Sequence, residues 1–406
     1  MSKKAHETAL PKLRFPEFRD AEAWEEVPLA KNLTEHKLKS DGKSEVYSVS
    51  VHKGVINQVE HLGRSFAAAD TSKYSLVKPF DVIYTKSPTG DFPYGIVKQN
   101  LTGRTVIVSP LYGVFAPTNE YVGYLIHSYF GYPSSMNNYL SSLVQKGAKN
   151  TIQISNDRFL SKGFYLPKKE AEQKKIATTL SSLDALLTAQ TAKLTALQAH
   201  KRGLMQDLFP AEGETVPKRR FPEFQDAGEW IERKLGDICK MQAGKFVSAS
   251  NIYAEAHESL FPCYGGNGLR GYTKTFTHKG KYSLVGRQGA LCGNVMLATG
   301  KFHATEHAVV TTPNSKVDTD WLYYLLVILD LNQYATGAAQ PGLSVQNIEK
   351  VKIRIPQAEA EQQRIANCLS TLDNLITAQS QKLETLKLHK KGLMQALFPA
   401  ASEPNA

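Results

Sequence analysis

The sequence predicts a mixed α/β (α+β) fold, in which two α/β domains are separated by two long helices that pair as an antiparallel coiled coil. Residues 167–210 recur without gaps as residues 356–399, and more than half of the positions are identical. Both stretches carry apolar residues at the alternating spacing of a coiled-coil seam. The segments before them share no comparable identity, so a repeated helical frame carries two different domains. The chain is therefore predicted to have a pseudo-two-fold internal repeat.

The repeat divides the 406 residues into five parts. A first domain, a first long helix, a second domain, a second long helix and a tail are predicted over residues 1–166, 167–210, 211–355, 356–399 and 400–406. Each domain opens with the same short motif, Phe-Pro-Glu-Phe followed by a tryptophan, which ends at Trp24 and again at Trp230. We expect the two halves of the chain to begin in the same way.

Short strands and single helices are predicted inside each domain. Runs of β-branched and aromatic residues between Gly, Pro and Asn are typical of strands. They predict strands over residues 74–77, 82–85, 105–109, 283–286 and 308–311. Apolar stretches predict helices over residues 121–129 and 321–331, the second capped by Asp318 or Thr319. A short strand, over residues 163–166 or 351–355, then leads into each long helix.

The long helices are predicted from their heptad spacing. The first seam comprises Ile176, Leu180, Leu183, Leu187, Gln190, Leu194, Leu197, Lys201, Leu204 and Leu208. The second comprises Ile365, Leu369, Leu372, Ile376, Gln379, Leu383, Leu386, Lys390, Leu393 and Leu397. Each stretch follows a proline, has two glutamates in its first turns, where the helix dipole favours anions, and ends at Phe-Pro. At 1.5 Å per residue, each seam is about 50 Å long.

An apolar seam needs a packing partner, and two alternatives exist. Each helix can pack on its own domain as ordinary core. Two nearly identical seams in one chain favour the second alternative, in which the helices pack on each other. Because a buried Leu or Ile contributes about 1.5 to 3 kcal/mol, the combined seams can offset the entropy of ordering both helices. Antiparallel pairing puts the domains at opposite ends, and we expect Gln190 and Gln379 to meet and fix the register.

Composition and charge indicate a soluble protein with a polyanionic partner. The chain is 42% hydrophobic and carries 49 Lys and Arg against 38 Asp and Glu, a net charge of +11. The surplus lies in residues 30–166 and 231–355. The longest apolar run, Trp321 to Leu329, is far shorter than the roughly 20 residues that span a bilayer, and no signal peptide is recognisable. We expect a cytoplasmic protein with no membrane partner.

No motif predicts a catalytic or nucleotide site in this chain. Residues 266–271 match GxGxxG, but residues 272–276 have strand composition, whereas a dinucleotide site requires a helix there. A glycine-rich turn that brings the backbone and Arg270 close to a ligand explains the motif better. The phosphate-binding pattern GxxxxGK[ST] does not occur. We predict no catalytic residue and no cofactor on this chain.

The cysteines give no metal or disulfide signal. The four cysteines are widely spaced and form no CxxC pair, which argues against a disulfide framework and a structural zinc site. His303 and His307 are spaced so that they could join Cys263 and Cys292 around zinc, but a polar strand face explains them better. We predict no metal ligand.

The remaining chemistry is that of DNA recognition. In the first domain the candidate contacts are Lys53, Gln58, Arg64, Lys73, Lys86, Lys98 and Arg104. In the second they are Tyr264, Asn267, Arg270, Tyr272, Lys274, Arg287 and Gln288. Arg and Lys suit phosphates and guanine, and Asn and Gln suit adenine. Any single residue can equally be a solvated surface residue, so the prediction rests on the two basic blocks.

The layout resembles the specificity subunit of a type I restriction-modification enzyme over essentially the whole chain. The pattern is Pro-x-x-Glu-x-Glu-Gln-x-x-Ile-Ala-x-x-Leu-x-x-Leu-Asp after each domain. The matching residues are Glu172, Gln173, Ile176, Leu180, Leu183 and Asp184, and Glu361, Gln362, Ile365, Leu369, Leu372 and Asp373. Residues 337–340 also resemble the glycine-bearing turn before the last strand of the family's target-recognition domains, from which Lys149 and Asn150 in the first copy depart.

This resemblance implies two target-recognition domains, each of which reads one half of a split, asymmetric site in double-stranded DNA, with the paired helices as a spacer. It implies two methyltransferase (modification) subunits that methylate adenine with S-adenosylmethionine, and motor-nuclease (restriction) subunits that use ATP and Mg. Those cofactors belong to the partners, so this chain is expected to be a non-catalytic subunit. One alternative is a two-headed DNA-binding transcription regulator without enzymatic partners, and another is a helical protein scaffold without DNA affinity.

Overall fold

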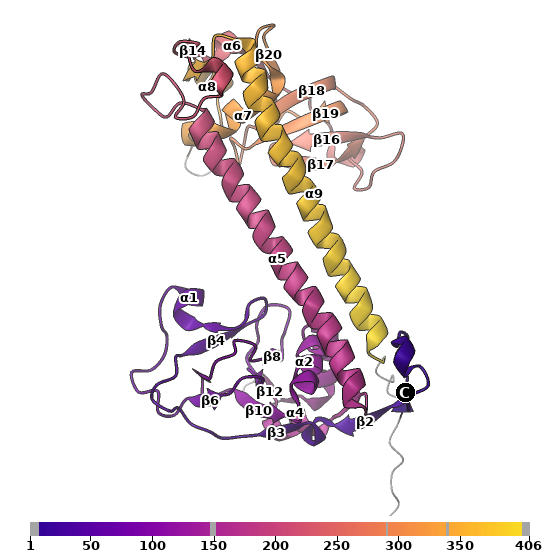
Figure 1. The fold of residues 1–406 in the computed structure, drawn as a ribbon. Coiled ribbons are helices and arrows are strands. Elements are labelled where there is room, and N and C mark those ends of the chain that lie inside the picture. The colour runs from indigo at the N-terminus through magenta and orange to yellow at the C-terminus, as the bar shows by residue number, and fades with distance from the viewer. Residues whose placement is uncertain (1–7, 147–151, 290, 338–340, 400–406) are drawn as a thin grey trace, which may run out of the picture. The chain divides into compact units, whose positions relative to one another are not determined.

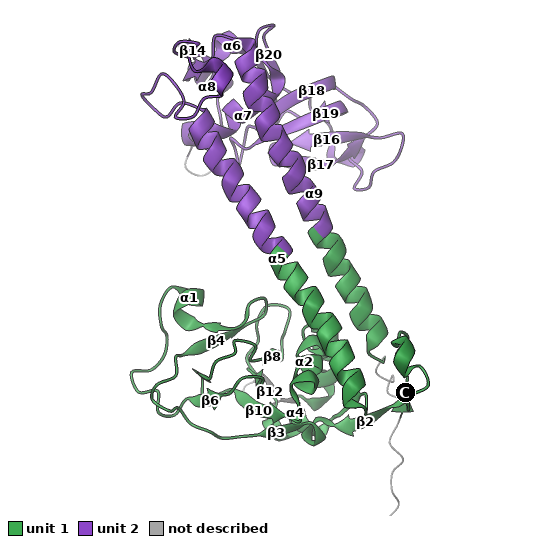
Figure 2. Ribbon diagram, in the orientation of Figure 1, with its two compact units in different colours: residues 1–189, 383–406 green, residues 190–382 purple. Residues whose placement is uncertain are grey.

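Two compact units make up the computed structural model, which describes residues 8–146, 152–289, 291–337 and 341–399. Residues 1–189 with 383–406 form unit 1, and residues 190–382 form unit 2 (Figure 2). Both boundaries fall inside a long helix, namely α5 (Glu170–Leu208) and α9 (Glu359–Leu397). Each unit therefore contains one mixed α/β domain and part of both long helices.

Unit 1 is built on short antiparallel strands. They are β1 (Thr8–Ala9), β2 (Trp24–Pro28), β3 (Leu33–Glu35), β4 (Tyr47–Ser50), β5 (Gly54–Asn57), β6 (Ser75–Val77), β7 (Val82–Tyr84), β8 (Val97–Gln99), β9 (Val106–Val108), β10 (Gly113–Pro117), β11 (Gln145–Lys146), β12 (Ile152–Gln153) and β13 (Gly163–Leu166). The larger sheets have the orders β3-β10-β7-β8 and β1-β2-β13. Strand β2 pairs with β13, so the opening of the domain lies beside the strand that leads into α5.

The helices of unit 1 are short, apart from its parts of α5 and α9. They are η1 (Pro16–Phe18), η2 (Leu29–Lys31), α1 (Gln58–Leu62), α2 (Glu120–Tyr129), α3 (Pro133–Leu140), η3 (Ser141–Leu143) and α4 (Asn156–Ser161). The side chains of Asn57, Asn119 and Ser155 accept hydrogen bonds from first-turn amides of α1, α2 and α4. Helix α2 lies beside the first half of α5 (Figure 1).

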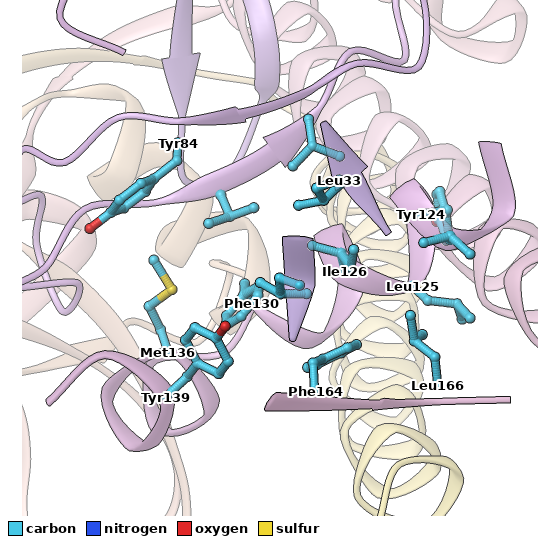
Figure 3. Close-up of a cluster of buried hydrophobic side chains, with 14 of the residues drawn as sticks. Leu33, Tyr84, Tyr124, Leu125, Ile126, Phe130, Met136, Tyr139, Phe164 and Leu166 are labelled. Carbon is cyan, nitrogen blue, oxygen red and sulfur yellow. The ribbon is translucent and has the colours of Figure 1, made fainter. Parts of the chain in front are cut away.

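The core of unit 1 joins the domain to both long helices. Figure 3 shows part of it, including Tyr124, Leu125 and Ile126 from α2 and Phe164 and Leu166 from β13. The long helices contribute Ile176, Leu180, Met394 and Leu397, and Phe398, which follows the end of α9, joins them. At about 1.5 to 3 kcal/mol for each buried apolar side chain, the end of α9 is an integral part of this core.

Unit 2 is built on a six-stranded sheet with the order β15-β20-β18-β19-β16-β17. Its strands are β15 (Cys239–Ala243), β16 (Phe261–Gly265), β17 (Gly268–Thr273), β18 (His278–Gly286), β19 (Val295–Ala304) and β20 (Ala308–Pro313). A separate pair joins β14 (Ile231–Lys234) to β21 (Lys352–Ile355). The helices are η5 (Pro222–Phe224), α6 (Leu235–Ile238), η6 (Ala249–Asn251), α7 (Thr319–Ile328), η7 (Leu331–Tyr334) and α8 (Val345–Ile348).

Three aromatic rings lie at the centre of the core of unit 2. The ring of Trp321, on α7, lies 6.1 Å from that of Phe209 and 6.2 Å from that of Trp230 between centroids. Ile365 and Leu369, near the start of α9, are buried in the same cluster. Phe209 follows the end of α5, so unit 2, like unit 1, is completed by the end of one long helix and the start of the other.

The two long helices are bonded to each other within each unit. In unit 2 the Nζ atom of Lys201 lies 2.6 Å from the carboxylate of Asp373. In unit 1 Lys390 pairs with Asp184. A residue late in one helix thus meets a residue early in the other, so the contacts run antiparallel. No helix in the described ranges, these two included, combines the length and hydropathy needed to cross a membrane.

The predicted seam residues lie on the less exposed side of each helix. Ile176, Leu180, Leu208, Ile365, Leu369, Leu383 and Leu397 are buried, and Leu183, Leu187, Leu194, Leu197, Leu204, Leu372, Ile376, Leu386 and Leu393 are half-buried. Gln379 donates from Nε2 to Oε1 of Gln190 at 2.7 Å, so the two glutamines expected to meet do so. The ends of each seam are buried in the domain cores, whereas the two helices contact each other at Gln190 and Gln379. Both packing alternatives are therefore present, at different positions along the seam.

The elements predicted inside the domains are present, with one clear difference. Strands β6, β7, β9 and β20 match the predicted ranges within two residues, and the stretch predicted at residues 283–286 is the end of the longer β18. The helix predicted over residues 321–331 ends at Ile328. Asp330 adopts a φ of 43°, which stops the helix before η7 begins. Asp318, one of the two candidate caps, accepts from two first-turn amides of α7.

A buried carboxylate ties the first domain to the start of α5. Glu172 accepts two hydrogen bonds from the guanidinium of Arg14, at 2.7 and 2.8 Å. The indole of Trp24 donates to the same carboxylate at 3.2 Å. Arg14 also donates to the backbone carbonyls of Ala21 and Glu22. The ion pair is thus extensively hydrogen-bonded, which a buried pair requires to be stable.

The same three residue types recur in unit 2. Arg220 donates twice to Glu361, each time at 2.7 Å, and once to the carbonyl of Gly228. Trp230 donates to the same carboxylate at 3.2 Å. The tryptophan of the motif that opens each domain therefore bonds to the glutamate of the repeated Glu-Gln pair.

Replacing Glu361 by Gln is expected to lower the free energy of unfolding by about 3 to 5 kcal/mol, because Arg220, whose side chain is only 10% exposed, loses its charge partner. Chemical denaturation of the full chain measures the change. Glu223→Gln is the matched control, since Glu223 pairs with Arg364 on the surface at 3.0 Å and the loss of an exposed ion pair is expected to have a much smaller effect. Equal losses from the two variants would contradict this account.

Candidate nucleic-acid interface

Loops from four places in the sequence meet in unit 2. We call them the glycine-rich loop cluster, which comprises residues 244–245, 264–270, 286–289 and 304–308. The amide of Gly244 donates to the carbonyl of Ala308 at 3.0 Å, and the amide of Arg287 donates to the carbonyl of His307 at 2.9 Å. Backbone hydrogen bonds therefore hold these loops against one another and leave the side chains available.

Two glycines make this close approach possible. A Cβ on Gly286 would lie 2.1 Å from the carbonyl oxygen of Gly266, and a Cβ on Gly244 would lie 2.1 Å from that of Ala304. Contacts this short exclude any side chain at either position. The match to GxGxxG within the cluster forms the β16–β17 hairpin and leads into a strand, as the sequence predicts.

Arg270 lies on a β-bulge beside the tip of this hairpin. The β16–β17 register shifts between Cys263 and Tyr264, which leaves Arg270 as the extra residue on β17. Bulges change the direction in which a side chain points. Arg270 is exposed and opens onto a cleft of about 430 Å³. Besides glycines, the cleft is lined by Asn267, Leu269, Arg270, Gln288 and His307.

A second cleft, of about 530 Å³, adjoins the first at Gln288. It is lined by Arg287, Gln288, Thr336, Gly342, Leu343, Ser344, Val345 and Gln346. Four of the predicted DNA contacts of the second domain therefore come together, namely Asn267, Arg270, Arg287 and Gln288. Guanidinium and amide groups gathered around shallow clefts suit phosphates and base edges.

Tyr264, Tyr272 and Lys274, which were also predicted contacts, lie apart from the clefts. The ring of Tyr264 packs edge-on against Phe302 at 5.8 Å and belongs to a small core. Tyr272 exchanges two backbone hydrogen bonds of 2.8 Å with Tyr253. Lys274 follows the far end of β17, where its Nζ lies 5.9 Å from the ring centroid of Tyr253.

Two of the residues considered for zinc have other partners. His303 is held between the hydroxyl of Thr275, at 3.2 Å, and the backbone carbonyl of Lys245, at 3.0 Å. The Sγ of Cys292 lies 3.5 Å from the side-chain amide of Asn332. Among the residues that the structure describes, no group of three or more His, Cys, Asp and Glu is placed to hold a metal ion.

The predicted contacts of the first domain are more scattered. Lys53, Arg64, Lys73 and Arg104 are exposed on turns and loops. The side-chain carbonyl of Gln58, at the start of α1, accepts from the amide of Phe66 at 2.7 Å. The guanidinium of Arg64 lies 4.6 Å from the centroid of the Phe66 ring. Gln58 therefore organises the loop that carries Arg64, and these are the two candidates that the structure links.

Two lysines of the first domain are withdrawn from solvent. Lys98, on β8, is buried. Burial, reinforced by the nearby charge of Lys390 and opposed by Asp184, lowers the pKa of Lys98 to about 8. The interpretation of Lys98 as a DNA contact is therefore wrong. Lys86 is half-buried in a left-handed backbone conformation, and burial lowers its pKa as well.

Sequence reasoning did not foresee the Tyr–Asp–Lys clusters, one in each unit. In unit 1 the hydroxyl of Tyr124, on α2, donates to Asp184 at 2.6 Å. The same carboxylate pairs with Lys390 of α9. One aspartate thus joins a domain helix to both long helices.

The second cluster repeats this arrangement in unit 2. Tyr324, on α7, donates to Asp373 at 2.7 Å, and Lys201 pairs with the same carboxylate and lies 5.2 Å from the tyrosine ring centroid. Burial, followed by the bond to Asp373, raises the pKa of Tyr324, so the hydroxyl keeps its proton and donates. The available signal was a lysine at a seam position of each helix together with the Leu-Asp pair of the repeated motif.

The glutamine of each Glu-Gln pair fixes a domain helix. Gln173 accepts from Asn119 at 3.0 Å and donates to the carbonyl of Pro167 at 2.7 Å. Gln362 accepts from the amide of Asp318 at 2.9 Å. Because Asn119 and Asp318 cap α2 and α7, the repeated motif sets the starts of these helices against the starts of α5 and α9.

Parts of the glycine-bearing turns lie outside the described residues. These parts are residues 147–151 in the first domain, which include Lys149 and Asn150, and residues 338–340 in the second. On either side of the second turn, Thr336 and Gly342 exchange backbone hydrogen bonds of 2.9 Å. Leu343 donates to the carbonyl of Arg287 at 2.8 Å, so this segment borders the second cleft.

Comparison with known sequences finds similarity to specificity subunits of type I restriction enzymes. The specificity subunit of the type I restriction enzyme EcoprrI from Escherichia coli is 46% identical over 152 residues, which are 37% of this chain and 38% of that protein. The MjaVIII specificity subunit from Methanocaldococcus jannaschii is 27% identical over 259 residues, 56% of this chain and 59% of that protein. The chain thus spans less than two thirds of the length of each relative.

Solved structures share the fold over most of the chain. The S subunit of a type I restriction-modification system from M. genitalium aligns with a TM-score of 0.67 and 15% identity, and the alignment covers 97% of this chain and 100% of that one. A chain from a structure on complex assembly and conformational transition of the type I R-M system aligns with a TM-score of 0.52 and 16% identity, covering 93% and 98%. A model of the type I restriction modification DNA specificity domain matches residues 31–199 and 227–388. The chain therefore belongs to the family of type I restriction-modification DNA specificity proteins.

Proposed function

We propose that this chain is the non-catalytic DNA-recognition subunit of a type I restriction-modification complex. The observation that carries the proposal is the gathering of Asn267, Arg270, Arg287 and Gln288 around two adjoining clefts in a chain of this family. Guanidinium and amide groups can read base edges in the major groove. The net charge of +11 supports binding to the phosphate backbone.

The proposed DNA site is bipartite and asymmetric. The two domains differ in sequence and in sheet order, so unlike domains would read unlike half-sites. The paired long helices would set the spacing between the half-sites, since a seam of about 50 Å corresponds to roughly one and a half turns of DNA at about 34 Å per turn.

In this proposal the partner subunits catalyse the reactions. Two methyltransferase subunits would dock along the long helices, flip the target adenine into their own pockets and methylate it with S-adenosylmethionine. Motor-nuclease subunits would join through them and use ATP and Mg. This chain would act in the cytoplasm as the part that selects the sequence and binds the duplex.

Methylome sequencing of cells with and without the gene tests the proposal. A split adenine-methylated motif that disappears with the gene is expected. A chain that instead binds one operator tightly on its own, with no change in the methylome, would be a two-headed transcription regulator, and that result would overturn the proposal.

Exchanging residues 231–355 for the corresponding segment of another family member is expected to change one half of the methylated motif and leave the other half intact. The reason is that each domain would read its half-site with its own loops. Methylome sequencing gives the result directly. A motif changed in both halves would show that the two domains do not read separately.

Deleting one heptad from each long helix at matching positions is expected to change the number of unspecified bases between the half-sites, or to abolish methylation. Each helix would shorten by about 10 Å, close to three base pairs. The spacer length in the methylated motif is the measurement. An unchanged spacer in an active complex would remove the role of the helices as a spacer.

Replacing Arg270 by Ala is expected to weaken binding of a duplex that carries the recognised motif by about 1 to 3 kcal/mol, because a base contact would be lost. Fluorescence anisotropy at fixed salt measures the change, with the chain assembled with its methyltransferase subunits. Lys240→Ala, which removes an equal charge from an exposed position on β15, is the control and is expected to have little effect. Equal losses of affinity from the two variants would show that Arg270 contributes to binding only through its positive charge.

A further inference from the structure

A second surface of unit 2 combines exposed aromatic rings with lysines. We call it the aromatic–lysine patch, which comprises Lys245, Phe246, Tyr253, Lys274, Phe276 and Lys301. Phe246 is 75% exposed, Phe276 44% and Tyr253 40%. An aromatic ring exposed to water forgoes part of the stabilisation that burial would give it, so three such rings on one surface are unusual for a region that faces only solvent.

Hydrogen bonds through His303 connect the two residues that precede the phenylalanines of the patch. One ring nitrogen of His303 lies 3.2 Å from the hydroxyl of Thr275, the residue before Phe276. The other lies 3.0 Å from the carbonyl of Lys245, the residue before Phe246. His303 is buried, so it holds both aromatic segments against the end of β19.

The lysines of the patch lie close to its rings. The Nζ of Lys301 lies 5.1 Å from the ring centroid of Phe276 and 5.7 Å from that of Phe261. The Nζ of Lys274 lies 5.9 Å from the ring centroid of Tyr253. Cations within about 6 Å of ring faces are attracted to them, and this keeps positive charge beside flat apolar surfaces.

The backbone that carries these rings is held in place. The amide of Lys245 donates to the carbonyl of Ala304 at 2.8 Å, and Tyr253 and Tyr272 exchange two hydrogen bonds of 2.8 Å. The segment from Gly244 to Tyr253 is therefore fixed at both ends. A ligand that stacks on its rings would meet a surface that is already ordered, which lowers the entropic cost of binding.

We propose that the aromatic–lysine patch binds single-stranded DNA by stacking its bases on Phe246, Phe276 and Tyr253. Exposed rings beside cations are the combination that single-stranded nucleic acid requires, because unpaired bases stack on rings while the phosphates need positive charge. Glu255 and Glu258 lie on the loop between Tyr253 and β16, whereas the three lysines lie next to the rings or beside Phe246 in the chain. The patch meets the glycine-rich loop cluster at Lys245 but shares no residue with the lining of the two clefts, and the proposal does not depend on the type I assembly.

The test uses the full chain and a fluorescent dT oligonucleotide of about 20 nucleotides. An abasic strand of the same length keeps the phosphates and lacks the bases, and it is expected to bind at least about 5-fold more weakly. Phe246→Ala is expected to weaken dT binding by about 5- to 150-fold without changing its salt dependence. Lys301→Ala is expected to lower the slope of log affinity against log salt by about 0.7.

Matched variants separate stacking from other effects. Phe246→Trp keeps a stacking ring and is expected to retain dT binding. Leu111→Ala removes a side chain of unit 1 that is equally exposed, at 74%, and this variant is expected to bind dT as the unaltered chain does. Equal binding of the dT and abasic strands, or equal affinities of the Phe246→Ala and Leu111→Ala variants, would overturn the proposal. Either outcome would leave the proposed recognition of duplex DNA standing.

Discussion

Two buried carboxylates, Glu172 and Glu361, impose the constraint on which the rest of the chain depends. A buried charge without a partner costs several kcal/mol, so each must be met by an arginine. The arginines come from far away in sequence, since Arg14 lies 158 residues before Glu172 and Arg220 lies 141 residues before Glu361. The entropy of closing loops of these lengths differs little. A domain of different length and sequence can therefore be inserted between the same two anchored ends, which explains a repeated frame with unlike domains.

The aspartates of the repeated motif extend this constraint to the helix pair. Asp184 and Asp373 each bind a tyrosine from a domain helix and a lysine from the opposite long helix. These polar contacts are partly buried, and shifting one helix by a turn would separate both partners from the carboxylate. Leucines along the seam tolerate several registers, whereas the aspartates and the bonded pair Gln190 and Gln379 accept one. Apolar packing thus supplies most of the stability, and the polar groups select the alignment.

The sequence was sufficient to predict the helices and strands whose residues follow a regular local pattern. Heptads predicted both long helices and their seam, and runs of β-branched residues predicted the strands at Val82 and Ala308. The strand composition of residues 272–276 argued against a dinucleotide site. Long-range pairing has no such period, so the link from Trp24 to Glu172 and the meeting of Arg270 with Gln288 could not be predicted. The prediction that Lys98 contacts DNA was wrong for the same reason. Its burial on β8 depends on α2 and on both long helices, and nothing next to it in the sequence signals this.

Neither unit is closed by one continuous stretch of chain. The core of unit 1 is completed by Met394, Leu397 and Phe398, which a polypeptide ending near Pro210 would lack. Such a polypeptide still contains Met205, Leu208 and Phe209, the same residue types at the end of its own helix, together with Lys201 in place of Lys390. The first half of the chain therefore contains both an incomplete domain core and a helix end of the type that completes such a core. Two identical half-length chains could then complete each other's cores and form a dimer with two copies of the same recognition domain.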